Sequence, residues 1–369
     1  MIGYTILGLL GIIIMGGTAF VNMSPEFGGT HTKADIERYE TSGNFKEGIF
    51  HNLTPVNMNM GAKNIVSLTY DYLFNASDRA PKNVPEVEKL DTNSFFKNDE
   101  NFSFVWFGHS TLLIKLDGKT ILIDPMFSDV PAPHPALGNS RYQKELPMNV
   151  EESPNIDYVL ISHDHYDHLD YQSIQTLKQK VKHFYVPLGI GAHLLEWGID
   201  QDKIQEFDWW EKSIINNYEF VFAPARHFSG RGPLNRFSTL WGSWIIKSEN
   251  KNIYFSGDSG FGDHFKTIGE KYGPFDLAFL ECGQYNELWP DVHMMPEETT
   301  QAALDLNAKS VMPIHWGSFT LALHTWTDPI ERLLKDATKF GLPIVAPKVG
   351  EIVSMSDGIP NLNHWWESN

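Results

Sequence analysis

Short apolar runs recur from residue 102 onward and predict the strands of the protein. The runs FVWFGHSTLLIKL and TILIDP flank Asp117-Gly118-Lys119, and Asp-Gly between two apolar runs is a strong signal for a β-hairpin. Further strand-like runs occupy residues 157–162, 183–187, 219–225, 240–248, 252–258, 276–281 and 310–315. Helical spacing, or Pro and acidic residues at the start, predicts helices over residues 63–73, 170–181, 296–306 and 329–340. Strands come first and then alternate with helices, which predicts two sheets sandwiched between helices.

The N-terminus follows a different pattern. Residues 2–21 read IGYTILGLLGIIIMGGTAFV, without a charged side chain, and a helix of about 20 residues spans roughly 30 Å, the thickness of the bilayer core. No Lys or Arg precedes Lys33 and no clean cleavage site follows, which argues against a signal peptide. We therefore expect residues 1–23 to be a single-pass membrane anchor of undetermined orientation. A buried core helix and a cleaved signal peptide are the alternatives.

The remaining chain divides into two parts that differ in their pattern of polar and apolar residues. Residues 24–100 are polar and predict an extension with a few short helices, which either packs on the main domain or stands between it and a membrane. Residues 101–369 contain the strand-rich pattern and predict the main domain.

Composition excludes some function classes. The chain has 369 residues, 42% of them hydrophobic and 20% charged, which is typical of a globular protein. The net charge of −17 does not suit nucleic acid, whose phosphates require a basic surface. Cys282 is the only cysteine, so an intrachain disulfide is impossible, and we expect it to be a buried apolar residue.

The highest density of potential metal ligands in the sequence follows the apolar run 157–162. His163, His165, Asp167 and His168 lie within six residues there, where a strand ends and a helix is predicted to begin. Imidazole nitrogens and carboxylate oxygens are typical zinc ligands, and they also suit iron and manganese. A polar loop that is rich in histidine by chance explains this density poorly. The segment therefore predicts a metal site.

Three further candidate ligands each follow an apolar run. His227 follows FAPAR, Asp258 follows YFSG and His315 follows VMPI. Each has an ordinary structural explanation when taken alone: a surface pair, a turn residue and a core imidazole. Their shared position at strand ends, where sites on β scaffolds usually form, strengthens all three together.

The ordered set H-x-H-x-D-H, His227, Asp258 and His315 resembles the metallo-β-lactamase superfamily. The resemblance covers residues 102 to about 350 and implies an αββα four-layer sandwich with two divalent metal ions at one edge. It implies that His163, His165 and His227 hold the first ion, that Asp167, His168 and His315 hold the second, and that Asp258 bridges them. Zinc is the first choice, and iron and manganese are compatible.

Two adjacent metal ions imply a hydrolytic mechanism. A water between them loses a proton because the ions lower its pKa toward about 7, and the hydroxide attacks a phosphorus or carbonyl centre. No protein nucleophile is required, so Ser110 and Ser162 are interpreted as structural. The catalytic candidates are Asp167, Asp258 and His293, the last because it resembles a histidine near the metals in the superfamily.

The flanking segments resemble one branch of the superfamily, N-acyl-phosphatidylethanolamine-hydrolysing phospholipase D and its bacterial relatives. These segments are SPEFGG (24–29), WFGHSTLLI (106–114), IDPMFS (123–128), PARHFSGRG (224–232), LWGSW (240–244), GPFDLA (273–278), HMMPEE (293–298) and IHWGSF (314–319). The branch implies phosphodiester hydrolysis of N-acyl phosphatidylethanolamine or a related phospholipid, which releases phosphatidic acid and an N-acylethanolamine. An N-terminal anchor is consistent with a substrate in a bilayer.

Several other residues have candidate roles beside the metals. Arg226, Arg231 and Arg236 suit bidentate contacts to a phosphate, and His293 could orient it; the alternatives are solvated loop charges and helix capping. Asp124 follows an apolar strand and is expected to hydrogen-bond the histidine loop. Five aromatic residues could line an acyl groove, although ordinary packing is the simpler explanation: Phe207, Trp209, Trp210, Trp289 and Trp326.

Three readings of function stay open. The first is a membrane-anchored phosphodiesterase whose partners are a phospholipid and the membrane. The second is a lactonase or phosphodiesterase of a small soluble metabolite, and the third is a non-catalytic metal-binding membrane component. Nucleic acid is not expected as a partner because of the acidic charge. The oligomeric state is undetermined, and a dimer is compatible with the sequence.

Overall fold

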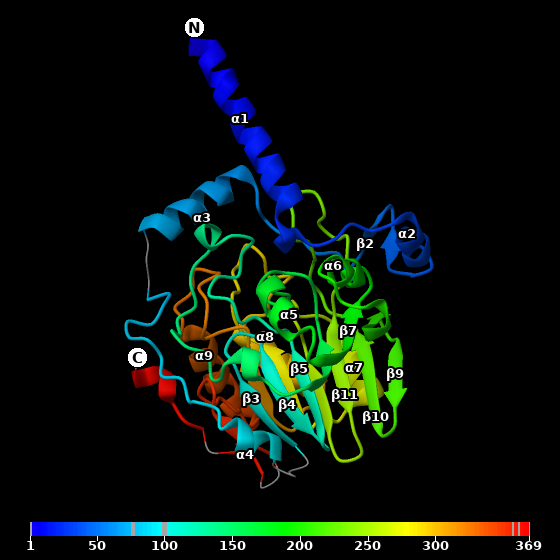
Figure 1. Cartoon of the computed structure of the whole chain (residues 1–369). Helices are drawn as coiled ribbons and strands as arrows, with labels where there is room; N and C mark the ends of the chain where they lie inside the picture. The colour runs from blue at the N-terminus through cyan, green and yellow to red at the C-terminus, as the bar shows by residue number, and fades with distance from the viewer. Residues whose placement is uncertain (1, 75–77, 98–101, 356–357, 361, 369) are drawn as a thin grey trace.

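The computed structural model of the chain describes residues 2–74, 78–97, 102–355, 358–360 and 362–368, without the side chains of residues 2, 3, 5–10, 13 and 368. The predicted domain boundary at residues 100 and 101 lies outside the described residues. Two mixed sheets form the body, and helices flank them (Figure 1).

The first sheet contains seven strands in the order β15-β3-β4-β5-β6-β7-β8. Their bounds are β3 Phe102–Trp106, β4 Leu112–Leu116, β5 Lys119–Ile123, β6 Ile156–Leu160, β7 Val181–Pro187, β8 Ile204–Phe207 and β15 Ile352–Ser354. Strands β15 to β5 pair antiparallel, and β5 to β8 pair parallel. The predicted hairpin is confirmed: Leu116 pairs with Lys119, and Asp117 and Gly118 have φ of 42° and 83°. Two positive φ values are what a tight two-residue turn between twisted strands requires.

The second sheet contains six strands in the order β14-β13-β12-β11-β10-β9. Their bounds are β9 Lys212–Ile215, β10 Tyr218–Ala223, β11 Ser243–Lys247, β12 Asn252–Phe255, β13 Leu277–Glu281 and β14 Val311–Ile314. Strands β9 to β12 pair antiparallel, and β12 to β14 pair parallel. Strand β10 therefore runs in the same direction as β12, β13 and β14. The C-terminal ends of these four strands meet at one edge of the sheet.

Alternation along the strands divides the core. Phe104, Ile114 and Leu160 of the first sheet belong to one apolar cluster with Phe222 and Phe279 of the second. The intervening residues face away from the second sheet and pack against α4, α5 and α6 in a separate cluster. Side chains of successive strand residues point to opposite faces, so each strand of the first sheet serves two apolar layers.

Helices cover the outer faces of both sheets. The helices of the main body are α5 Tyr171–Leu177, α6 Ile190–Glu196, α7 His264–Tyr272, α8 Pro296–Asp305 and α9 Asp328–Ala337. The helices predicted over residues 170–181, 296–306 and 329–340 are confirmed, with α5 ending earlier than expected at Leu177. Helices α6 and α7 were not predicted.

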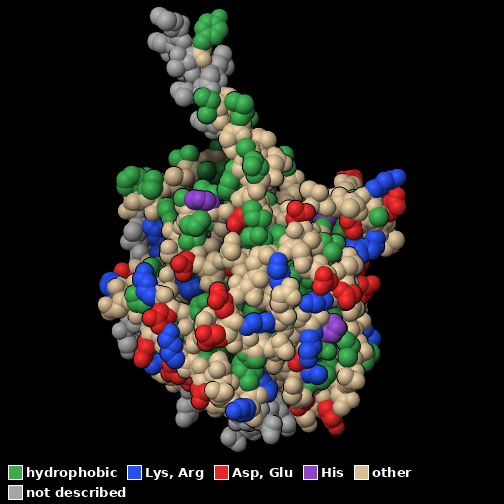
Figure 2. All heavy atoms as spheres, in the orientation of Figure 1, with side chains coloured by type: hydrophobic (Ala, Val, Ile, Leu, Met, Phe, Trp, Pro, Cys, Tyr) green, Lys and Arg blue, Asp and Glu red, His purple; other side chains and the backbone are tan. Residues whose placement is uncertain are grey.

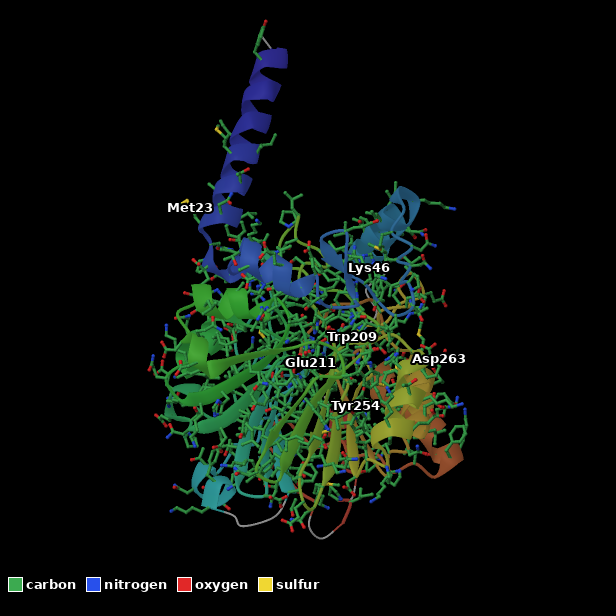
Figure 3. All side chains as sticks on the ribbon, turned by 90° about the vertical axis from the view of Figure 1, so that its right-hand side faces the viewer. Met23, Lys46, Trp209, Glu211, Tyr254 and Asp263 are labelled. Carbon is green, nitrogen blue, oxygen red and sulfur yellow. The ribbon has the colours of Figure 1, made fainter. Side chains whose placement is uncertain are left out.

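The N-terminal part lies along one end of the body. Its elements are α1 Ile2–Met23, α2 Lys33–Tyr39, β1 Phe45–Lys46, β2 Ile49–Phe50, α3 Ala62–Phe74 and α4 Thr92–Lys97. Figure 3 shows Met23 and Lys46 at this end, whereas Trp209 and Tyr254 lie within the body. The helix predicted over residues 63–73 is confirmed as α3.

Helix α1 projects from the body (Figure 1). No helix in the described part of the chain is both long enough and apolar enough to cross a membrane. The prediction that residues 1–23 form a membrane anchor is therefore corrected: residues 2–23 form helix α1, and its described residues do not meet the requirements for a membrane span. The side chains of residues 2, 3, 5–10 and 13, on which part of the prediction fell, lie outside the described residues.

Candidate metal centre

The loop after β6 carries four of the predicted ligands. Strand β6 ends at Leu160, and the chain then turns so that the backbone N–H groups of His168 and Leu169 both donate to the carbonyl of His165. Asp170 closes the loop by capping α5, since its side chain accepts from the N–H of Ser173. This compact turn brings the side chains at 163, 165, 167 and 168 to one side of the sheet edge.

Three histidine nitrogens converge in the first part of the centre. His165 Nδ1 lies 2.9 Å from His163 Nε2 and 3.3 Å from His227 Nε2. The outer nitrogens of two rings are engaged elsewhere: His163 Nδ1 lies 2.9 Å from Ser162 Oγ, and His227 Nδ1 lies 2.9 Å from the Val292 carbonyl. The remaining nitrogens therefore point toward one another, as ligands of a single ion do.

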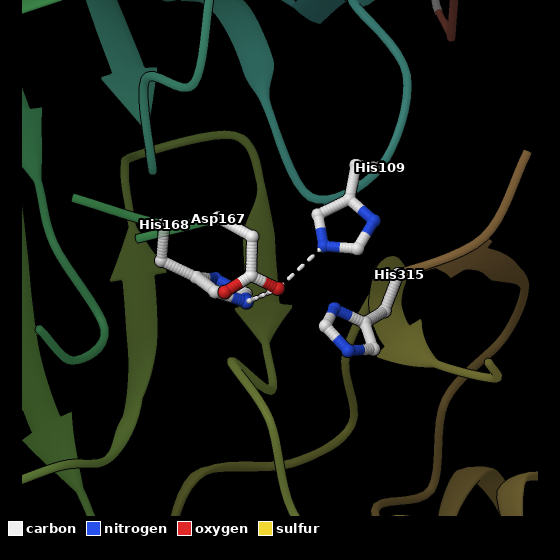
Figure 4. Close-up of side chains that lie close together, drawn as sticks. All are labelled: His109, Asp167, His168 and His315. Atoms are coloured by element: carbon white, nitrogen blue, oxygen red, sulfur yellow. Dashed lines mark hydrogen bonds and ion pairs between the residues drawn. The ribbon is translucent and has the colours of Figure 1, made fainter. Parts of the chain in front are cut away.

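A second group surrounds Asp167 (Figure 4). Its Oδ2 lies 2.8 Å from His109 Nε2 and 3.4 Å from His168 Nε2. His315, at the end of β14, stands next to His109 with ring centroids 4.2 Å apart. The backbones of these two residues are also joined, because the N–H of His315 donates to the His109 carbonyl over 3.0 Å.

Asp258 lies between the two groups. Its Oδ2 is 3.7 Å from both His163 Nε2 and His227 Nε2. Its Oδ1 is 3.2 Å from His168 Nε2 and 3.1 Å from His315 Nδ1. Each oxygen of the carboxylate thus faces a different group, which is the arrangement expected of a bridging ligand.

Unpaired atoms and charge show that these residues fit metal ions. His168 Nε2 and Asp258 Oδ1 are buried and lie 3.2 Å apart, but neither makes a well-aligned hydrogen bond with a described residue, although buried polar atoms normally make one. Burial lowers the pKa of His165 to about 4 and that of His163 well below its usual value, so both imidazoles are neutral, as ligation requires. The arrangement is consistent with a dinuclear site, and it does not select the metal.

The carboxylates favour positive charge at this point. Burial alone lowers the pKa of His168, but Asp258 and Asp167 outweigh burial and raise it well above its ordinary value. Burial raises the pKa of Asp258 to about 6, against the lowering effect of His168. Divalent cations supply the positive charge that such buried carboxylates require.

Asp124 supports the histidine loop from behind. Its Oδ1 accepts from the Ser162 N–H over 2.7 Å, and its Oδ2 accepts from Ser162 Oγ over 2.5 Å and lies 2.7 Å from His168 Nδ1. Asp124, His109 and His315 all have positive φ, of 43°, 54° and 65°. Non-glycine residues seldom adopt this conformation, and it concentrates at functional sites.

Two predicted phosphate contacts lie elsewhere. Arg231 is 2% exposed, and it donates to the carbonyls of Glu26, Asp164 and Leu169. Arg226 forms an ion pair with Asp291 over 2.7 Å. Neither arginine lines the cavity in front of the candidate metal ligands. Both guanidinium groups instead join loops away from that cavity.

The cavity in front of the cluster has a volume of about 260 Å³. Its lining combines the cluster with apolar residues and comprises Met58, Met60, His165, Asp167, His227, Phe228, Asp258, Gln284, Trp289, Val292, His293, His315 and Leu321. The exposed Arg236 stands near this lining, with its guanidinium carbon 4.4 Å from the centre of the Phe228 ring. Of the aromatic residues singled out in the sequence, Trp289 lines the cavity, whereas Phe207, Trp209 and Trp326 are buried in the core.

Three residues of the site were missed by the sequence interpretation. His109 contacts Asp167; Glu281 contacts His293 with Nδ1 to Oε2 at 2.8 Å; and Gln284 lines the cavity. His109 follows the apolar strand β3, so the strand-end signal used for the other ligands could have found it. Glu281 is the last residue of the apolar run 276–281 and of β13, so the same strand-end signal could have found it. Cys282, its neighbour, is buried as expected.

Glu281 is expected to act in its neutral form. Burial raises its pKa well above the usual value, and a neutral carboxyl can donate to His293 Nδ1 while accepting from the Met294 N–H. Glutamine reproduces this pattern, so we expect Glu281→Gln to stay within about 1 kcal/mol of the wild-type unfolding free energy. We expect Glu281→Ala to lose about 2–4 kcal/mol, because it creates a cavity and leaves a buried N–H unpaired.

Denaturant unfolding measures both changes, with the exposed Glu297→Gln as a control for the loss of a carboxylate on the same side of the protein. A glutamine variant as unstable as the alanine variant would show that Glu281 is ionised.

Similarity to known proteins assigns the chain to a family. A model described as "Beta-lactamase superfamily domain" matches residues 119–316, more than half of the chain. The chain belongs to the metallo-β-lactamase superfamily. Within the superfamily it is a metal-dependent hydrolase, and its histidines and aspartates form the dinuclear-type site described above.

Superfamily relatives are similar over most of the chain. An uncharacterized protein of Mycobacterium tuberculosis is 39% identical, over 89% of this chain and 88% of its own. N-acyl-phosphatidylethanolamine-hydrolyzing phospholipase D 1 of Caenorhabditis elegans is 34% identical, over 71% of this chain and 78% of its own. Among solved structures, Igni18 of Ignicoccus hospitalis, a metallo hydrolase, has a TM-score of 0.51 and 23% identity, over 68% of this chain and 97% of its own. The last likeness shows the fold alone.

Proposed function

We propose that this protein hydrolyses a phosphodiester bond of N-acyl phosphatidylethanolamine or a related phospholipid, as a phospholipase D does. The observation that carries the proposal is an apolar cavity of about 330 Å³ beside the metal cluster. Met60, Trp289 and Leu321 line both this cavity and the one at the cluster. A substrate with its phosphate at the cluster can therefore extend an apolar chain under α3. The similarity to the Caenorhabditis elegans enzyme supports the same substrate class.

We assign the ligands from the two converging groups. His163, His165 and His227 hold one ion, Asp167, His168 and His315 hold the other, and Asp258 contacts both. Divalent ions bound there supply Lewis acidity to the phosphoryl oxygens and acidify water. The reaction adds the oxygen of water to phosphorus and breaks the bond from phosphorus to the ethanolamine oxygen, which leaves with a proton.

The side chains around the cluster bind and orient the substrate. Glu281 holds His293 through Nδ1, so His293 Nε2 is the ring nitrogen available to a substrate oxygen in the cavity. Burial lowers the pKa of His293, which keeps the ring neutral with a proton to donate from Nε2. Arg236, beside Phe228, is the arginine that we assign to the phosphate at the cavity mouth.

The surface of α3 supports an interfacial substrate. None of its described residues is buried, and Val66, Leu73 and Phe74 are 70%, 62% and 69% exposed. Figure 2 shows hydrophobic side chains gathered over α3, below the projecting α1. Exposed apolar patches of this kind mark contacts with proteins or membranes. Helix α3 covers the apolar cavity, so a lipid surface at α3 lies next to the path to the metals.

The test is the direct conversion of lipid. Purified metal-loaded protein is incubated with phosphatidylcholine vesicles that contain isotope-labelled N-acyl phosphatidylethanolamine, and the products are identified by mass spectrometry. We expect equal amounts of phosphatidic acid and N-acylethanolamine. The proposal fails if the protein cleaves soluble phosphodiesters or lactones but releases no phosphatidic acid from the vesicles.

Introducing charged residues on α3 is expected to lower the turnover of lipid in vesicles without changing the hydrolysis of a soluble substrate. The double variant Val66→Asp and Phe74→Asp should lower turnover in vesicles at least tenfold, because burial of one such side chain contributes ~1.5–3 kcal/mol. Hydrolysis of soluble bis(p-nitrophenyl) phosphate should not change. Ile214→Asp, at a 63% exposed site on β9, is the matched control and should affect neither substrate. Equal loss on both substrates would contradict docking through α3.

A further inference from the structure

The backbone of His227 is held by a residue far away in the sequence. The Asn52 side chain accepts from the His227 N–H through Oδ1 over 3.1 Å and donates from Nδ2 to the His227 carbonyl over 2.7 Å. An N–H can only donate and a carbonyl can only accept, so the two contacts fix which end of the Asn52 amide is oxygen. The same Oδ1 also accepts from Trp241 Nε1 over 3.2 Å.

His227 depends on these contacts because it lies outside the sheet. Strand β10 ends at Ala223, so no neighbouring strand pairs with residue 227. Among the described residues, no other hydrogen bond to its backbone N–H or carbonyl is found. Asn52 thus occupies both polar groups of the backbone, while the Val292 carbonyl fixes the ring. Together these contacts set the position of Nε2.

Asn52 belongs to a segment, residues 50–60, that we call the strap. The strap runs from the His227 loop to the loop before His293: Pro55 accepts from Arg226, the N–H of Asn57 donates to Asp291, and the N–H of Asn59 donates to Leu288. Met58 and Met60 of the strap line the cavity at the cluster. The strap lies outside residues 119–316, the part that matches the family model.

We propose that Asn52 is a positioning residue of the metal centre, and that the strap is part of the site. Asn52 does not touch substrate or metal; it places His227 so that its Nε2 completes the group with His163 and His165. Removal of a group that orients a metal ligand typically lowers metal affinity 10–100-fold. The inference rests on the metal centre and is independent of which substrate is cleaved.

Metal titration of the full-length protein tests the proposal. Asn52→Ala removes both contacts, and the isosteric Asn52→Asp keeps the acceptor but replaces the donor with a charge that repels the His227 carbonyl. We expect each variant to bind Zn²⁺ at least tenfold more weakly at one of two sites. We also expect an altered visible absorption spectrum with Co²⁺, which reports ligand geometry. A residue with a merely structural role would not change that spectrum.

Asn44→Ala is the matched control. Asn44 is also half-buried in the N-terminal part and bonds the main body, since its Nδ2 donates to Asp208 over 3.2 Å, but it contacts no candidate ligand. It should keep the wild-type affinity and spectrum. The proposal is overturned if a folded Asn52 variant keeps both, and Asn52→Asp decides the matter if Asn52→Ala does not fold. Wild-type protein that binds two ions but cleaves no lipid refutes the proposed function alone.

Discussion

Replacing Asp258 with alanine is expected to lower hydrolysis about 10³-fold or more and to reduce the bound metal from two ions toward one. Its two oxygens face different groups of histidines, so its loss removes a ligand from both ions and a negative charge from between them. A 10³-fold effect corresponds to about 4 kcal/mol of transition-state stabilisation, which is within what metal-bound charge supplies. Steady-state kinetics and metal analysis of the same preparation measure the two effects.

Two variants sharpen this prediction. Asp258→Asn keeps the size of the side chain but removes its charge, and it should be nearly as damaging as alanine. Asp263→Ala, an exposed residue at the start of α7, should keep activity and metal content. If Asp258→Ala retains two ions and more than a tenth of the activity, Asp258 does not bridge them.

Chelation of the metals is expected to abolish hydrolysis and to lower the melting temperature by about 5 °C for each of the two ions removed. An ion present at 100 times its Kd stabilises the folded state by about 2.7 kcal/mol, and each kcal/mol shifts the melting temperature of a large domain by ~2 °C. In the metal-free protein, only His168, whose pKa they raise, balances the charges of Asp167 and Asp258. Calorimetry before and after dialysis against a chelator measures the shift.

Adding one metal at a time to the metal-free protein identifies the metal that supports hydrolysis. Activity should return with at least one of zinc, manganese and iron, each added to separate samples of the same metal-free protein. If full activity persists in protein shown by metal analysis to be free of metal, the assignment of a metal-dependent mechanism is wrong.

Short sequence patterns predicted those elements of the fold that depend on neighbouring residues. The hairpin followed from Asp117-Gly118, because only a few residue pairs adopt two consecutive positive φ values easily. Apolar runs located most strands. Helices α6 and α7 were not predicted. Gly189 before α6 offers no capping side chain, whereas Asp263 before α7 is a residue type typical of helix starts and could have indicated that helix.

The candidate ligands were predictable because each follows a strand and is a typical metal-binding residue. The structure brings all seven together. Of their surroundings, Asp124 was predicted and does hydrogen-bond the histidine loop, but other contacts over long sequence separations were not predictable. Arg231 looked like a phosphate contact, but its guanidinium faces backbone carbonyls of the histidine loop and of Glu26. Asn52 gave no signal at all, since its partner lies 175 residues away.

The division of the ligands between the two sheets has a consequence for folding kinetics. His163 and His165 follow the first sheet, whereas His227, Asp258 and His315 follow strands of the second, and the backbone link between His109 and His315 joins the two at the same edge. Neither sheet alone presents a complete set for either ion. Metal capture therefore waits until both sheets have docked, and the rate at which refolding protein takes up cobalt measures the last step of assembly rather than the first.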